Sequence, residues 1–325
     1  MSFVPDEPLY DFDKTPVIEI TDIPAEQIQY VRSNLLPGFE SCDDATIKRF
    51  IRATGANLPL SVKRLNKTLQ WRKENNPENT VCLACVKNPR SHYLHMVGHD
   101  TAGRPIIYSC LENPTNNDLE DNKKHMIQTF ESAIKHMPPG VEQWIWLCDI
   151  YGFSVADAST KIAKAFLDIS AEHYPERLYK FVILGAPSIF SVLWKAVAPL
   201  VDPKTYKKIR IVAYDAVPSK KDEKKAAKAL KKGEVPSDFK SQLLDELNSF
   251  CDASTRDWIL RELAYNRSKK KGDHDVYSYQ HLYLSACKGH LLPINDDGEH
   301  NIYGCPNLMR LYTEKPDLLL PQGKM

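Results

Sequence analysis

The sequence predicts an α/β protein in which a small helical lobe precedes a mostly parallel sheet surrounded by helices. Residues 24–91 carry apolar side chains at helical spacing and contain no strand-like run. From residue 92 onward, short apolar runs alternate with helical patterns, as in parallel strands joined by crossover helices. We therefore divide the chain into an extended arm (1–23), the helical lobe (24–91), an α/β domain (92–250) and a C-terminal extension (251–325).

The composition is that of an ordinary globular protein. The chain has 325 residues, of which 42% are hydrophobic and 26% charged, and its formal net charge is +1. This charge gives no reason to expect nucleic acid as a partner. The first residues lack the basic and apolar regions of a signal peptide. Lys195 and Pro199 interrupt the best candidate for a membrane span, which needs roughly 18 apolar residues. We therefore expect a cytoplasmic monomer.

Three amphipathic helices account for the N-terminal lobe. Pro24 marks the start of the first, Asp43 and Asp44 open the second, and the third begins near Pro59. In each helix the apolar residues recur at intervals that place them on one face. They are Ile28, Val31 and Leu35, then Ile47, Phe50 and Ile51, and then Val62, Leu65 and Leu69.

Five apolar runs predict the sheet. The first two, 93–97 and 105–109, flank a turn containing Asp and Gly and predict a hairpin. The run 141–150 is apolar almost throughout, as in a strand that is covered on both faces. The runs 178–184 and 209–213 complete the sheet. Helical patterns between the runs place apolar residues together at Met126, Phe130 and Ile134, and at Ile162, Phe166 and Ile169.

The segment from Tyr174 to Lys208 is the most informative part of the chain. A buried strand and the turn Gly-Ala-Pro-Ser lead into residues 189–200, which as a helix would be apolar on nearly all sides. A polar and basic stretch beginning at Asp202 then returns the chain to the sheet. A helix of this kind lies in a core, in a membrane or over something apolar.

Several motifs together resemble one known family. They are Arg49-Phe-Ile-Arg52-Ala, Trp71-Arg72, Asp100-Thr-Ala-Gly-Arg-Pro105, Tyr174-Pro-Glu-Arg, Ala186-Pro187 and Asp202-Pro-Lys-Thr205-Tyr-Lys-Lys208. In this order and spacing, over roughly residues 24–214, they resemble the CRAL-TRIO family, and within it the phosphatidylinositol/phosphatidylcholine transfer proteins of the secretory pathway. The resemblance implies a lipid-binding lobe with a sheet as its floor and a mobile gate helix, here at 188–200, over its mouth.

The resemblance also implies binding residues. Glu176, Thr205 and Lys208 match the positions that contact the head group of phosphatidylinositol. Lys and Thr donate to phosphate, and a carboxylate accepts from ring hydroxyls. The fourth contact is an Arg, but Thr54 occupies its position here. The alternative for Lys208 is one more surface lysine. We expect the cavity wall and gate to include Trp144, Trp146, Phe190, Leu193, Trp194 and Val197.

At two positions the sequence differs from the phosphatidylcholine contacts of the family, and two arginines have a structural interpretation. The Ser and Thr that bind phosphatidylcholine in the family correspond to Trp144 and Trp146, which share one face of a strand. Indoles cannot replace a pair of hydroxyls, so phosphatidylcholine is not expected; the alternative for both residues is ordinary core packing. We interpret Arg49 and Arg52 as structural residues that hold the helical lobe to the sheet lobe.

The cysteines leave one further alternative. There are eight, spread along the chain, and in a reducing compartment we expect most of them to be packed core residues. Cys82 and Cys85, followed by His92 and His95, offer two thiolates and two imidazoles, enough for a zinc tetrahedron. Because their spacing is not a common zinc-finger pattern, we favour packed cysteines, with no metal and no cofactor other than a bound lipid.

A gated hydrophobic cavity leaves three classes of function. We favour a non-enzymatic carrier that transfers or presents phosphatidylinositol, touching the membrane surface transiently; a sterol or tocopherol-like ligand is the alternative. We disfavour an enzyme, because the chain has no Gly-rich phosphate loop, nucleophile elbow, zinc-protease motif or dinucleotide fingerprint. A membrane-recruited scaffold with a regulatory lipid pocket is the third class. Residues 220–232 are lysine-rich and suit either an anionic membrane or plain solvent.

Overall fold

The computed structural model describes residues 20–88, 91–111, 114–154, 159–215 and 241–268. The predicted arm (apart from its last residues), the lysine-rich segment 220–232 and most of the C-terminal extension lie outside the described residues. Within the part that is described, no helix is both long enough and apolar enough to cross a membrane.

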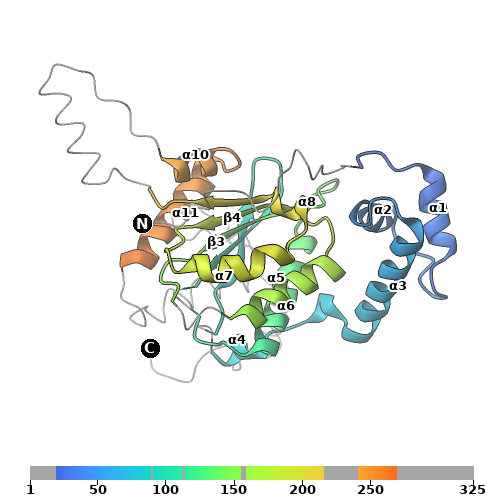
Figure 1. Ribbon diagram of the computed structural model, residues 1–325, viewed down its shortest axis with the longest axis horizontal. Helices are drawn as coiled ribbons and strands as arrows, with labels where there is room; N and C mark the ends of the chain where they lie inside the picture. Colours follow the sequence, from blue (N-terminus) through green and yellow to red (C-terminus); the bar gives the residue numbers. More distant parts are fainter. Residues whose placement is uncertain (1–19, 89–90, 112–113, 155–158, 216–240, 269–325) are drawn as a thin grey trace, which may run out of the picture.

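The N-terminal lobe consists of α1 (Ala25–Ser33), α2 (Asp44–Ala53) and α3 (Leu58–Asn75). Side-chain caps start two of these helices, since the Asp43 carboxylate accepts from the Thr46 amide at 2.7 Å and the Asn57 side chain accepts from the Leu60 amide at 3.1 Å. Their apolar faces form one core, as the spacing predicted. Figure 1 shows this lobe beside the sheet lobe, to which η1 (Pro77–Asn79) and α4 (Leu83–Lys87) lead.

The second lobe is built on a five-stranded sheet in the order β1-β2-β3-β4-β5. Its strands are β1 (Leu94–His99), β2 (Pro105–Cys110), β3 (Trp144–Asp149), β4 (Leu178–Leu184) and β5 (Ile209–Val212). The first two strands pair antiparallel, and each later strand pairs parallel with the one before it. The predicted hairpin and the mostly parallel sheet are confirmed.

Helices cover the two faces of the sheet (Figure 1). On one face lie α5 (Leu119–Lys135), α6 (Thr160–His173) and α7 (Phe190–Val197); on the other lie α10 (Gln242–Asn248) and α11 (Ala253–Ser268). Side chains along β3 alternate accordingly: Ile145 and Leu147 pack with α10 and α11, whereas Trp144 and Trp146 face the opposite side. α11 belongs to the segment that the sequence assigned to the C-terminal extension, yet it contributes to the main core of the sheet.

A buried ion pair fastens α11 to the sheet. Asp149, at the end of β3, has no exposed side-chain surface, and both of its oxygens accept from the Arg267 guanidinium at 2.7 Å. Arg267 also lies over the Tyr214 ring, 3.8 Å from its centroid. The close approach restricts Gly185, which has φ of 67°: a Cβ there would lie 3.1 Å from Arg267 Nη2. The C-terminal edge of the sheet is therefore held by charge as well as by packing.

Ion pairs also join the two lobes. The guanidinium groups of Arg49 and Arg52 lie 3.4 and 3.6 Å from the Glu142 carboxylate, just before β3. The structural role predicted for both arginines is thereby confirmed. Arg72 of α3 binds Glu131 of α5 through two hydrogen bonds of 2.7 and 3.0 Å. Charged contacts thus connect the lobes at several points, among them also Lys67 of α3 with Glu172 of α6.

Candidate functional site

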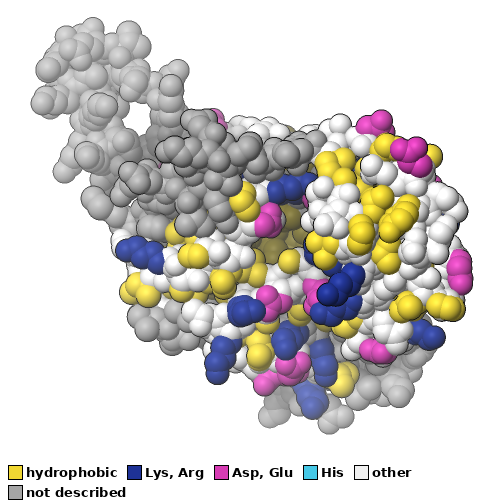
Figure 2. Space-filling view, turned by 45° about the vertical axis from the view of Figure 1, so that its right-hand side comes forward, with side chains coloured by type: hydrophobic (Ala, Val, Ile, Leu, Met, Phe, Trp, Pro, Cys, Tyr) yellow, Lys and Arg dark blue, Asp and Glu magenta, His cyan; other side chains and the backbone are white. Residues whose placement is uncertain are grey.

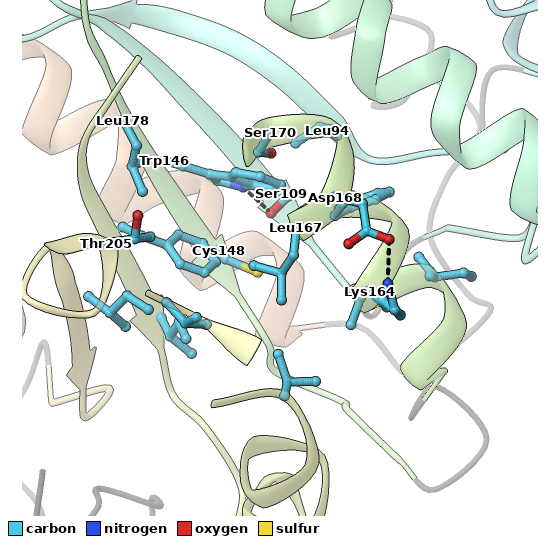
Figure 3. Close-up of a pocket in the computed structure, with 18 of the residues that line it drawn as sticks. Leu94, Ser109, Trp146, Cys148, Lys164, Leu167, Asp168, Ser170, Leu178 and Thr205 are labelled. Atoms are coloured by element: carbon cyan, nitrogen blue, oxygen red, sulfur yellow. Dashed lines mark hydrogen bonds and ion pairs between the residues drawn. The ribbon is translucent and has the colours of Figure 1, made fainter. Parts of the chain in front are cut away.

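A cavity of about 690 Å³ lies between the sheet and the helices α5, α6 and α7. All nine residues proposed from the sequence line it: Trp144, Trp146, Glu176, Phe190, Leu193, Trp194, Val197, Thr205 and Lys208. Its wall is mainly apolar. In Figure 3, Trp146 and Cys148 from β3 point from the sheet toward Leu167 of α6. Burial raises the pKa of the Cys148 thiol to about 12, so this thiol stays protonated at neutral pH and behaves as an apolar wall residue.

The helix α7 has two apolar faces. Phe190, Leu193, Trp194 and Val197 recur at helical spacing and line the cavity. On the other side, Val192 remains 63% exposed and Ile189, just before the helix, is 39% exposed; Leu200, beyond the helix, is 55% exposed but also lines the cavity. The prediction of a helix that is apolar nearly all round is confirmed: one side covers the cavity, and the other faces outward.

Two tryptophans fill the floor of the cavity. Trp144 is buried and stacks on Phe130 of α5 at 4.5 Å between ring centroids. Trp146 is half-buried, its ring centroid lies 5.1 Å from that of Phe181, and its indole N–H donates to Ser109 Oγ at 2.9 Å. The polar atom of Trp146 is therefore already engaged within the protein, and the rings present aromatic surface to the cavity.

Charged side chains gather at one end of the cavity. The Glu176 carboxylate accepts from Lys204 Nζ at 2.5 Å and lies 3.7 Å from Lys208 Nζ, which also donates to the carbonyl of Leu178 at 2.8 Å. Glu176 has a φ of 60°, a left-handed conformation that costs a non-glycine residue about 1–2 kcal/mol. Such strain is typical of functional positions, where the surrounding structure holds a side chain in place.

Lys204 and Thr205 belong to the short helix α8 (Pro203–Tyr206). The Asp202 carboxylate caps this helix by accepting from the Thr205 amide at 2.9 Å. Thr205 lines the cavity together with Trp146, and Figure 3 shows both side chains. Lys204 is not among the head-group residues predicted from the sequence, although it stands inside the motif that contains Thr205 and Lys208.

The surface of the molecule is hollowed. Figure 2 shows a depression with hydrophobic side chains at its floor and Lys, Arg, Asp and Glu side chains around its rim. This combination of an apolar interior and charged edges suits an amphiphile, with its tail inward and its polar group near the rim.

A comparison with protein families identifies the α/β lobe. Residues 90–229 match the model of the CRAL/TRIO domain. The sheet lobe of this chain is therefore similar to CRAL/TRIO domains. The expected fold of that family, a sheet-floored lobe preceded by a helical lobe, is the fold observed here.

Curated relatives support the same assignment. A CRAL-TRIO domain-containing protein of Schizosaccharomyces pombe is 29% identical over 167 residues, which are 50% of this chain and 16% of that protein. The SEC14 cytosolic factor of Yarrowia lipolytica is 26% identical over 200 residues, 54% of this chain and 40% of its own length. Phosphatidylinositol transfer protein PDR17 of Saccharomyces cerevisiae is 29% identical over 171 residues, 48% of this chain and 49% of its own length. The chain thus spans half or less of each of these three relatives.

Among solved structures, the crystal structure of Sfh5 covers 53% of this chain and 68% of its own, with 18% identity and a TM-score of 0.43.

One position departs from the contact that the resemblance to CRAL-TRIO transfer proteins implied. Thr54 ends α2, and its hydroxyl donates to backbone carbonyls of that helix and lies 2.6 Å from Ser61 Oγ. An arginine does reach the cavity from the helical lobe, because Arg64 of α3 lines it and donates to the carbonyl of Ala171 in α6 at 2.5 Å. No motif in the sequence singled out Arg64. Its position follows from the packing of α3 against α6.

Proposed function

We propose that this protein binds a phospholipid, preferably phosphatidylinositol, and transfers or presents it at membranes. The observation that carries the proposal is one cavity that combines an apolar wall with a charged end. Its volume of about 690 Å³ falls in the range of ligand cavities. Each methylene that leaves water gains about 0.8 kcal/mol, so acyl chains supply ample binding energy.

The charged end supports an anionic, hydroxylated head group. Lys204 and Lys208 face the single carboxylate of Glu176, so the three side chains together carry net positive charge. The negative charge of a phosphodiester would neutralise this positive charge, and the hydroxyls of an inositol ring would donate hydrogen bonds to the Glu176 carboxylate. The Thr205 hydroxyl adds a donor on the same side. The name of the relative PDR17, a phosphatidylinositol transfer protein, supports this ligand class. Phosphatidylcholine is disfavoured because indoles stand where its hydroxyl contacts are expected.

The outer side of α7 supports transient contact with a membrane. Ile189 and Val192 leave apolar surface in water when the cavity is closed. Insertion of this surface into a bilayer would stabilise an α7 that has moved away from the cavity, so that docking and opening become one linked event. The protein would act from the cytosol as a carrier without catalysis.

Mass spectrometry of lipids that co-purify with the full chain tests the proposal. We expect phosphatidylinositol in the wild type, and transfer of labelled phosphatidylinositol, but little phosphatidylcholine, between vesicles. The double variant Lys204→Ala/Lys208→Ala should lose most of both signals. The matched control Lys63→Ala/Lys207→Ala removes two exposed lysines and should keep them.

Three outcomes would contradict the proposal. A sterol or another neutral hydrophobe as the co-purified ligand would overturn the head-group assignment. Stable lipid binding without any transfer between vesicles would favour a scaffold with a regulatory pocket. Hydrolysis of the bound lipid by the purified protein would assign the cavity to an enzyme.

A further inference from the structure

Four buried side chains from three segments meet beside the cavity. Cys82 caps the short helix α4, Cys85 lies within it, His92 lies two residues before β1, and His125 belongs to α5. No side chain of the four is exposed by more than 2%. Their sulfur and ring nitrogen atoms all lie within 4.8 Å of one another. The sequence had offered His95 as the fourth member, but the structure brings His125 to this place instead.

The distances within the cluster fit a single metal ion. Cys82 Sγ and Cys85 Sγ lie 3.5 and 3.3 Å from Nδ1 of His92, and Cys85 Sγ lies 3.4 Å from Nδ1 of His125. In a zinc tetrahedron, bonds of about 2.3 Å to sulfur and about 2.0 Å to nitrogen place neighbouring sulfur and nitrogen atoms about 3.5 Å apart. All three sulfur–nitrogen distances in the cluster agree with this value. An iron–sulfur cluster with two irons would require the ligands to be spread over two metals.

The orientation of both imidazoles agrees with metal ligation. Nε2 of His125 lies 2.8 Å from the carbonyl oxygen of Leu94, so the proton sits on Nε2 and the lone pair of Nδ1 points at the thiols. This contact of the distal nitrogen is the one that metal-bound histidines make. The ring of His92 stacks on that of His125 at 4.7 Å and also directs Nδ1 at the sulfurs. Its Nε2 is buried and has no hydrogen-bond partner among the described residues.

We propose that Cys82, Cys85, His92 and His125 bind one zinc ion in a closed tetrahedral site. Two thiolates and two imidazoles are a ligand set that selects zinc over magnesium or calcium, which prefer oxygen. Four protein ligands leave no open position, so the ion is structural and not catalytic. It ties α4 and the start of β1 to α5. His92 and His125 also line the cavity, so the ion stiffens the cavity wall. This site does not depend on the identity of the lipid.

Elemental analysis of the full chain, purified with reductant and without added metal, tests the site. We expect about one zinc per chain, and an X-ray absorption spectrum with two sulfur and two nitrogen neighbours at about 2.3 and 2.0 Å. Cys85→Ser and His125→Gln should each reduce the zinc content several-fold. The matched controls are Cys251→Ser and His95→Gln, which change a buried cysteine and a neighbouring histidine outside the cluster and should keep the zinc.

Cobalt substitution covers the case in which the cysteine or histidine variants fail to fold. The wild-type chain loaded with Co²⁺ should show thiolate-to-cobalt charge transfer and the intense visible bands of tetrahedral coordination. The proposal is overturned if the wild type contains no zinc and takes up neither added Zn²⁺ nor Co²⁺ in stoichiometric amount. It is equally overturned if the metal has oxygen neighbours only, or if His95→Gln loses the metal while His125→Gln retains it.

Discussion

Replacing the outward apolar residues of α7 should weaken membrane binding and leave the fold intact. Val192 is 63% and Ile189 39% exposed, and full burial of such a side chain is worth about 1.5–3 kcal/mol. Scaled by the exposed fractions, insertion of both contributes about 1.5–3 kcal/mol. Because 1.4 kcal/mol corresponds to a factor of ten, Ile189→Ser/Val192→Ser should lower partitioning into vesicles about 10- to 140-fold. Surface changes of this kind alter stability by only about 0.5 kcal/mol.

Sedimentation with sucrose-loaded vesicles of phosphatidylcholine and phosphatidylinositol measures the partitioning. Leu36→Ser/Leu60→Ser is the matched control, since these leucines of the helical lobe are 47% and 41% exposed and lie away from α7. The control should bind as the wild type does. The reasoning is refuted if both double variants lose the same affinity, or if the α7 variant binds vesicles normally.

Three further changes probe the scaffold. Arg267→Met leaves the Asp149 carboxylate buried without its partner and should lower the unfolding free energy by about 3–5 kcal/mol in urea titrations; a loss below about 1 kcal/mol would contradict the pairing. Phe130→Ala should enlarge the cavity and lower the unfolding free energy by about 3–5 kcal/mol. A stability close to that of the wild type in urea titrations would contradict this. Burial lowers the pKa of His173 to about 4, below its ordinary 6.5, so stability present above pH 6.5 falls as the pH drops toward 4. His173→Phe retains a ring against Trp71 and should flatten this decline; parallel pH profiles would refute it.

The regular elements were predictable because local pattern determines them. The helices of the N-terminal lobe follow from apolar spacing and from caps such as Asp43, and the strands follow from short apolar runs. The apolar helix α7 was also evident, since residues 189–200 have too few polar side chains to face water alone. Motifs then located Glu176, Thr205 and Lys208, and the structure places all three on one cavity.

Residues that act across the fold were not predictable in this way. Arg64 reaches the cavity only because α3 packs against α6, and no local pattern distinguishes it from other helix-surface arginines. Lys204 meets Glu176 whereas Lys207 is exposed, and no local pattern distinguishes these two lysines. Arg267 lies 118 positions beyond Asp149, and no sequence spacing predicts such a buried ion pair.

The sequence by itself determined where helices and strands form, the apolar character of α7, and the grouping of Cys82 and Cys85 with His92, because each depends on residues close together in the chain. The tertiary structure alone decided which second histidine joins them. His95 is closer along the chain, but it lies on β1 outside the cluster, whereas His125 is carried to the thiols by α5 packing on the sheet. A binding site requires convergence in space, and in this chain convergence depends on how helices pack and not on how residues are spaced.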